Sequence, residues 1–280
     1  MKIDAHQHFW QLARGDYGWL APGLAPIYRD FMPADLAPIL ARHRIARTIL
    51  VQAAPTVAET EFMLAVAART PFVAGVVGWV DFTAPDAPRD IERLAADPLL
   101  VGLRPMVHDF ADANWLLRSD LAPAVDAMIT HGLVFDALVR PAHLPRLEQF
   151  IARHPALSVV VDHGAKPEIG QHSFEPWLAD LAAVAQYGGV RCKLSGLVTE
   201  AAAGWREADV RPYIDHLLGL FGADRLVWGS DWPVVDLAGG YDAWRGLTSS
   251  ALTALGPSQK AAVLGGNAAE LYLSSGRGRV

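Results

Sequence analysis

The chain opens with Met-Lys-Ile-Asp-Ala-His-Gln-His-Phe-Trp (residues 1–10), a stretch that predicts a buried β-strand with polar groups on one face. Side chains of a strand point alternately to its two faces, so Asp4, His6 and His8 should share a face. The other residues of the stretch are mostly apolar, which disfavours a solvated surface strand. Two imidazoles two residues apart converge on one point, and we expect the chemistry there.

Seven further apolar runs alternate with helical stretches along the chain. With the first, the expected strands are residues 2–9, 47–53, 72–80, 101–107, 133–139, 157–163, 190–195 and 225–230. The expected helices are residues 33–42, 57–70, 85–96, 114–130, 145–154, 175–186, 209–221 and 258–273. Near-continuous Val, Ile and Leu is typical of parallel strands covered on both faces. The pattern predicts an α/β fold, a TIM-type (β/α)8 barrel that residues 1–280 form as a single domain.

An open doubly wound sheet is the alternative fold. It requires a glycine-rich phosphate-binding turn after the first strand, and the sequence His-Gln-His-Phe-Trp contains no glycine.

Composition excludes several classes of protein. The chain has 280 residues, is 52% hydrophobic and carries a net charge of -6, with no basic stretch interleaved with aromatic residues, so nucleic acid is not expected as a partner. No run approaches the ~18 apolar residues of a membrane span, and the first residues are too polar for a signal peptide. Cys192 is the only cysteine, which suits a reducing compartment. We expect a cytoplasmic monomer or homodimer with a small-molecule partner.

Polar side chains gather where the predicted strands end. In a barrel of this kind the catalytic groups lie at the carboxyl-terminal ends of the strands. Those positions carry His6, His8, Arg104, Asp136, His163, Lys193, Ser195 and Asp231, with His108 and Lys166 just beyond. Because polar groups are costly to bury without partners, their concentration at one end indicates a site.

The residue types at these strand ends favour hydrolysis. Asp231 is expected to act as the general base that takes a proton from water. Hydrogen bonds to a carbonyl oxygen that becomes an oxyanion are expected from His6, His8, Arg104 and His163. A covalent nucleophile is not expected, since no Gly-x-Ser-x-Gly motif occurs and Cys192, with Val190 and Leu194 around it, is expected to be buried. The set therefore predicts attack of water on an ester, lactone or amide.

Five other residues are expected to contact the substrate. Trp10 and Trp232 adjoin motif residues and are expected to stack on a sugar ring, whereas Trp19 is interpreted as packing. Hydroxyl groups are the expected partners of His108 and Lys166. Ser195 is expected to make a polar contact, because no separate base for it is evident.

Two further charged residues lie at the predicted strand ends. Lys193 is expected to pair with Asp4 inside the barrel, either as a structural ion pair that holds the strand layers together or as a catalytic pair. Asp162 precedes His163 and is expected to point toward the helix layer.

The motifs together resemble the amidohydrolase superfamily. Its His-x-His pair, its histidine after strand six and its aspartate after strand eight match His6, His8, His163 and Asp231. Finer strings resemble the sugar-lactonase branch: Asp-Ala-His-Gln-His-Phe-Trp (4–10), Gly-Leu-Arg (102–104), Asp-His-Gly-Ala-Lys-Pro (162–167), Lys-Leu-Ser-Gly-Leu (193–197) and Gly-Ser-Asp-Trp-Pro (229–233). That branch includes hydrolases of L-fuconolactone and L-rhamnonolactone and, more distantly, a pyrone-dicarboxylate lactonase. The resemblance implies hydrolysis of a sugar-acid lactone.

Two positions depart from the binuclear metal pattern of the wider superfamily. Arg104 occupies the place of a bridging lysine or glutamate, and Asp136 the place of a histidine ligand. A guanidinium beside two dications would be repelled, so a two-metal centre is not expected. The resemblance implies that no cofactor is required, although a single divalent cation such as zinc fits His6, His8 and Asp231.

Two other functions compete with lactone hydrolysis. A zinc-dependent decarboxylase, or another metal-dependent hydrolase on the same scaffold, would use His6, His8, His163 and Asp231 as ligands. A non-catalytic barrel that binds sugar acids would need the cavity but not Asp231. The full set of catalytic side chains at the strand ends disfavours this non-catalytic function.

Overall fold

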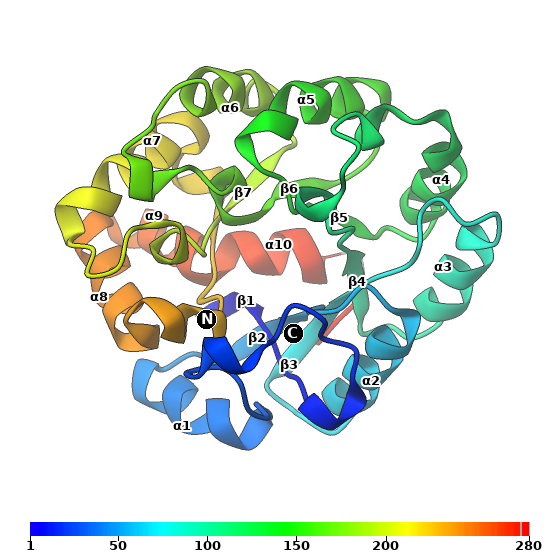
Figure 1. The fold of residues 1–280 in the computed structure, drawn as a ribbon, viewed down its shortest axis with the longest axis horizontal. Coiled ribbons are helices and arrows are strands. Elements are labelled where there is room, and N and C mark those ends of the chain that lie inside the picture. Colours follow the sequence, from blue (N-terminus) through cyan, green and yellow to red (C-terminus); the bar gives the residue numbers. More distant parts are fainter. Residues whose placement is uncertain (275, 280) are drawn as a thin grey trace.

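Eight parallel strands form a nearly closed ring in the computed structural model, which describes residues 1–274 and 276–279 (Figure 1). In ring order the strands are β1 (Ile3–Gln7), β2 (Arg47–Val51), β3 (Val73–Gly78), β4 (Leu100–Leu103), β5 (Val134–Ala137), β6 (Val159–Val161), β7 (Arg191–Leu194) and β8 (Leu226–Trp228). The first and last strands meet through backbone hydrogen bonds just beyond β8, from Asp231 to the carbonyl of His6 (2.8 Å) and from His8 to that of Trp232 (2.7 Å). The predicted (β/α)8 barrel is confirmed.

An outer layer of helices surrounds this ring (Figure 1). Its members are α1 (Pro33–His43), α2 (Val57–Ala68), α3 (Ala87–Ala95), α4 (Ala122–Thr130), α5 (Leu144–Arg153), α6 (Trp177–Ala185), α7 (Glu207–Arg225) and α8 (Gly240–Ala251). Capping residues and first-turn prolines fix where several of these helices begin. Thr56 caps α2 by accepting a hydrogen bond from the Glu59 amide (3.0 Å), and Pro33 occupies the first turn of α1.

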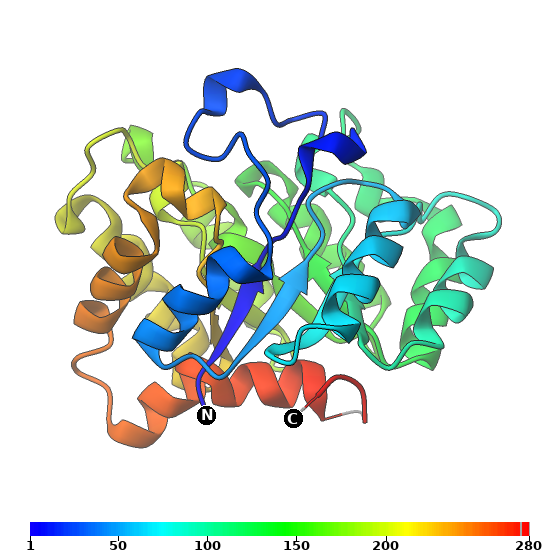
Figure 2. The same cartoon turned by 90° about the horizontal axis from the view of Figure 1, so that it is seen from below.

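The C-terminal region differs from the expected eighth helix at 258–273. The helix that completes the outer layer is α8, which lies at residues where the sequence analysis expected no helix. The later segment contains α9 (Pro257–Ala261), a π-helical turn at 262–266 and α10 (Asn267–Leu273). Of these, α10 lies across the amino-terminal end of the barrel (Figure 2). Gly265 allows this crossing, since an added Cβ there would lie 2.4 Å from the Met1 carbonyl oxygen.

An irregularity in β1 decides which side chains enter the barrel. The register pairs Asp4 with Thr48 and Gln7 with Leu50, so β1 holds one residue more than its neighbour, a β-bulge. Asp4 therefore faces the helix layer, where its Oδ2 accepts a hydrogen bond from the Tyr241 hydroxyl (3.1 Å) on α8. The prediction that Asp4 shares a face with the two histidines was wrong, because the bulge resets the alternation between them.

Two apolar clusters fill the molecule. The larger lies between strands and helices, and the smaller fills the barrel, where Ile3, Val51 and Val227 pack with Leu271 and Tyr272 of α10. The floor of the barrel is thus closed by α10, which leaves the carboxyl-terminal end open for a site. In the part of the chain that the structure describes, no helix is both long and apolar enough to cross a membrane.

Candidate active site

Three imidazoles surround one carboxylate oxygen at the carboxyl-terminal end of the barrel. Asp231 Oδ1 lies 3.2 Å from Nε2 of His8, 3.6 Å from Nε2 of His6 and 3.9 Å from Nε2 of His163. Asp231 follows β8 with a backbone φ of 60°, a left-handed conformation rare in residues other than glycine. Such strain persists where surrounding bonds enforce it, here the hydrogen bond from the Asp231 amide to His6.

Neighbouring side chains favour the ionised form of Asp231. Burial alone would raise the pKa of this carboxyl, but His163 and the hydrogen bond from His8 outweigh burial and lower it. His8 Nδ1 lies 2.8 Å from the Val51 carbonyl oxygen, which can only accept, so Nδ1 carries a proton. The site holds an ionised carboxylate that is ready to accept a proton.

His163 is held by a turn rather than by a strand. It follows β6 with a φ of 52°, and its Nδ1 lies 2.9 Å from the Ser195 hydroxyl oxygen. Gly196 makes room for the ring, since a Cβ there would lie 2.4 Å from Nδ1. Burial lowers the pKa of His163 to about 4, so the ring is neutral near pH 7. Ser195 is fully buried and lies away from the cavity, so its observed partner is His163.

A buried charge network lies beneath these residues. Lys193 pairs with Asp136 and with Asp162, whose Oδ1 is 3.0 Å from Nζ, and Nζ also lies 3.1 Å from Nδ1 of His6. The Tyr272 hydroxyl of α10 donates to Asp136 (2.8 Å). The predicted pairing of Lys193 with Asp4 was wrong, because Asp4 faces outward and Lys193 meets two carboxylates inside the barrel.

Arg104 connects this network to the cavity. Its Nη1 lies 3.3 Å from both Asp162 Oδ2 and His6 Nε2, and its Nη2 donates to the Gln52 carbonyl oxygen. Although burial opposes it, the charges of Lys193 and Arg104 lower the pKa of Asp162 to about 2. The expectation that Asp162 points to the helix layer was wrong, because β6 ends at residue 161 and the following turn redirects the side chain inward.

A cavity of about 250 Å³ opens above Asp231. Six residues predicted for the site line it: His8, Arg104, His108, His163, Lys166 and Asp231. At its edge Lys166 is paired with Glu200, and burial lowers the pKa of His108 to about 3.

Other predicted site residues lie behind the cavity wall. His6 is fully buried and contacts Asp231 and Arg104 from below. The Trp10 and Trp232 side chains are buried and pack on Phe31, with ring centroids 5.5 and 5.2 Å from it. The tryptophan that lines the cavity is Trp19.

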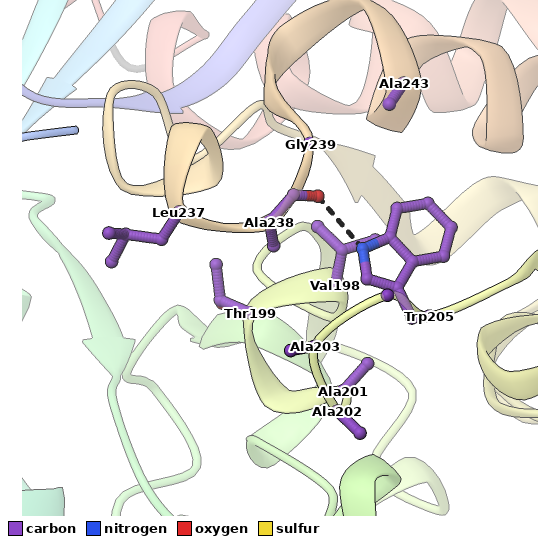
Figure 3. A pocket seen from close by; sticks show the side chains of 11 residues that line it. Val198, Thr199, Ala201, Ala202, Ala203, Trp205, Leu237, Ala238, Gly239 and Ala243 are labelled. Carbon is purple, nitrogen blue, oxygen red and sulfur yellow. Dashed lines mark hydrogen bonds between the residues drawn. The ribbon is translucent and has the colours of Figure 1, made fainter.

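A larger hollow of about 630 Å³ lies between the loops that follow β7 and β8 (Figure 3). Figure 3 shows mostly apolar side chains there, with the Trp205 indole donating to the Ala238 carbonyl oxygen (2.9 Å). None of the described residues that line it has a titratable side chain, so it offers no acid, base or metal ligand. The smaller cavity above Asp231 is therefore the candidate active site.

The donor set also fits a single metal ion. His6, His163 and Asp231 each offer one ligand atom, and these atoms lie within 4.8 Å of one another. Two imidazoles and a carboxylate are ligands that zinc accepts. This set contains His163 in place of the predicted His8, whose Nε2 lies against Asp231 and whose Nδ1 is engaged by Val51.

Comparison with known proteins identifies the family. The model of the amidohydrolase family matches residues 3–273. The chain belongs to the amidohydrolase family. This amidohydrolase is 50% identical over 275 residues to a curated L-fucono-1,5-lactonase of Burkholderia ambifaria, covering 97% of this chain and 95% of that protein. It is 36% identical over 284 residues to an L-fucono-1,5-lactonase of Burkholderia multivorans, covering 97% and 96%. A zinc-bound amidohydrolase structure from Burkholderia multivorans superposes with a TM-score of 0.91 at 36% identity, covering 97% and 99%.

Sequence reasoning missed several residues that shape the site of this amidohydrolase. Asp162 was assigned outward, and Trp19 was interpreted as packing. Glu59, on α2, is fully buried and accepts hydrogen bonds from the amides of Ala53 and Ala54 at the end of β2. A charged residue on the apolar face of helix 57–68 is a signal that could have found Glu59.

Proposed function

We propose that this chain hydrolyses a sugar-acid lactone, L-fucono-1,5-lactone, to the open-chain acid. The observation that carries the proposal is the ionised Asp231 at the floor of a cavity lined by basic side chains. The identity of 50% to a curated L-fucono-1,5-lactonase over 97% of the chain supports this substrate. L-rhamnono-1,5-lactone is the second substrate to test, because the sequence motifs resemble those of enzymes that hydrolyse either lactone.

Asp231 acts as the general base. A water molecule beside its carboxylate loses a proton to Asp231 while its oxygen forms a bond to the lactone carbonyl carbon. The carbonyl oxygen becomes an oxyanion, which accepts hydrogen bonds from Arg104 and, when its Nε2 carries the proton, from His163. His8 holds the Asp231 carboxylate in place through its Nε2. The His6 side chain is fully buried below the cavity, so it positions Asp231 and Arg104 and does not contact the substrate.

The tetrahedral intermediate then collapses. The bond between the carbonyl carbon and the ring oxygen breaks, and the ring oxygen receives the proton that Asp231 took from water. Atoms and charge balance with one water consumed, so no co-reactant is needed. Around the ring, His108 and Lys166 bind hydroxyl groups, and the ion pair with Glu200 keeps Lys166 at the rim.

The test is Asp231→Asn, assayed with a panel of aldonolactones and a pH indicator. Asparagine keeps the size of the side chain but cannot accept the proton, so kcat should fall by ~10²–10⁴ with KM within a few-fold of wild type. A kcat near that of the wild type on the best lactone would refute Asp231 as the base.

A metal-dependent hydrolase, or a zinc-dependent decarboxylase, is the second candidate, favoured by the convergence of His6, His163 and Asp231. A divalent cation held by these residues would polarise the substrate carbonyl as a Lewis acid. We expect lactone hydrolysis to survive exhaustive chelation, because Arg104 and His163 supply the hydrogen bonds to the oxyanion. Activity that is lost on chelation and restored by zinc would favour the second candidate.

The setting of the enzyme is part of the same proposal. We infer a cytoplasmic enzyme from the single cysteine, and we expect a monomer or homodimer. Its partner is the sugar lactone. Light scattering of the purified chain measures the oligomeric state.

A further inference from the structure

Trp19 is an exposed aromatic residue on the wall of the catalytic cavity, and the mechanism above gives it no role. It belongs to residues 11–30, the segment that rises above the barrel mouth in Figure 2. Its side chain is 38% exposed, whereas Trp10 and Trp232 are buried. A large aromatic surface left open beside a catalytic carboxylate indicates a contact that forms only when substrate binds.

The indole of Trp19 is held in one orientation. Its Nε1 donates a hydrogen bond to the Ala53 carbonyl oxygen (2.7 Å). Trp10 packs against it at an interplanar angle of 89°, with 5.5 Å between ring centroids. The segment is tied at its base by two backbone hydrogen bonds of 3.0 Å between Trp10 and Phe31. A ring fixed in this way loses little conformational entropy on binding a ligand.

A buried carboxylate holds the acceptor of that hydrogen bond in place. Glu59 accepts from the amides of Ala53 (3.0 Å) and Ala54 (2.7 Å) and is fully buried. The preceding carbonyl, that of Gln52, accepts from Arg104. Trp19 and Arg104 therefore donate to two consecutive backbone carbonyl groups. Trp19 lies at the wall of the cavity, and Arg104 lies where the carbonyl group of the substrate would react.

We propose that Trp19 is the platform on which the apolar face of the sugar-lactone ring stacks. The proposal rests on the proposed function and adds the residue that holds the sugar ring. Sugar rings present a face of C–H bonds, and an indole is the side chain that offers the largest flat apolar surface to it. Because the ring lies on Trp19 both before and during attack at its carbonyl, the contact lowers KM and leaves kcat unchanged.

Steady-state hydrolysis of L-fucono-1,5-lactone by four proteins tests this: wild type, Trp19→Ala, Trp19→Phe and Tyr28→Ala. Tyr28 is the matched control, because it lies in the same segment with 39% exposure and does not line the cavity. Trp19→Ala should raise KM about 10-fold with kcat within about 2-fold, from the loss of about 1.4 kcal/mol of stacking. Trp19→Phe should recover most of that loss, and Tyr28→Ala should match the wild type.

Three outcomes would overturn the platform. They are a KM for Trp19→Ala within 2-fold of wild type, a loss confined to kcat, and a Trp19→Phe variant as poor as Trp19→Ala. Calorimetric binding of L-fucono-1,5-lactam, whose ring nitrogen slows hydrolysis, separates this proposal from the catalytic one. If the wild type hydrolyses no lactone but binds the lactam more tightly than Trp19→Ala does, Trp19 keeps its role and the proposed function fails. If the wild type neither hydrolyses the lactone nor binds the lactam, both fail.

Discussion

Replacing Lys193 by methionine tests whether the charge network beneath the site is balanced. Lys193 and Arg104 supply two positive charges, and Asp136 and Asp162 two negative ones, all buried. At the 3.0 Å between Lys193 and Asp162, and with an effective dielectric constant of about 20, the Coulomb attraction is about 5.5 kcal/mol. Removing one partner from such a set typically costs about 3–5 kcal/mol. That is a large part of the ~5–15 kcal/mol that stabilises a folded chain.

The double variant Lys193→Met with Asp136→Asn restores the balance by removing one charge of each sign. We expect Lys193→Met alone to lower the free energy of unfolding by about 3–5 kcal/mol. The double variant should cost at least about 2 kcal/mol less than the sum of the two single variants. Urea unfolding followed by circular dichroism and by fluorescence measures each value. Lys260→Met, a surface control whose Nζ meets only the Thr253 carbonyl, should stay within about 0.5 kcal/mol of wild type. Costs that add within about 0.5 kcal/mol would refute charge balance as the basis of the network.

Three further predictions concern the supports of the site. Ser195→Ala should lower kcat about 5-fold with KM unchanged, because His163 loses a hydrogen bond worth about 1 kcal/mol; steady-state kinetics measures it. Gly196→Ala should reduce kcat more strongly while the circular dichroism spectrum is kept, since its Cβ displaces the His163 ring. Burial raises the pKa of Glu59 to about 7 from 4.5. Its contribution to stability is therefore fully present below about pH 4.5 and is lost as pH rises through about 7, by about 3 kcal/mol. Unfolding of wild type and Glu59→Gln at pH 4.5 and pH 8 measures it; an equal difference between them at both values would contradict the raised pKa.

Local sequence signals determined the architecture of this protein. The alternation of apolar runs with helical periodicity predicts the barrel, because both periods follow from the covalent geometry of a few neighbouring residues. Barrel topology then places every strand end at one face, so His8, Arg104, His163 and Asp231 could be assigned to one cavity without coordinates.

Contacts between residues distant in sequence decided the rest. One extra residue in β1 turned Asp4 outward, and the turn after β6 brought Asp162 inward to Lys193, although simple alternation predicted the opposite for both carboxylates. Residues 11–30 have no periodicity, so only the folded chain shows Trp19 at the cavity. Alternation reports the face of a regular strand and carries no information across a bulge, a turn or a loop, because side-chain direction there depends on partners elsewhere in the chain.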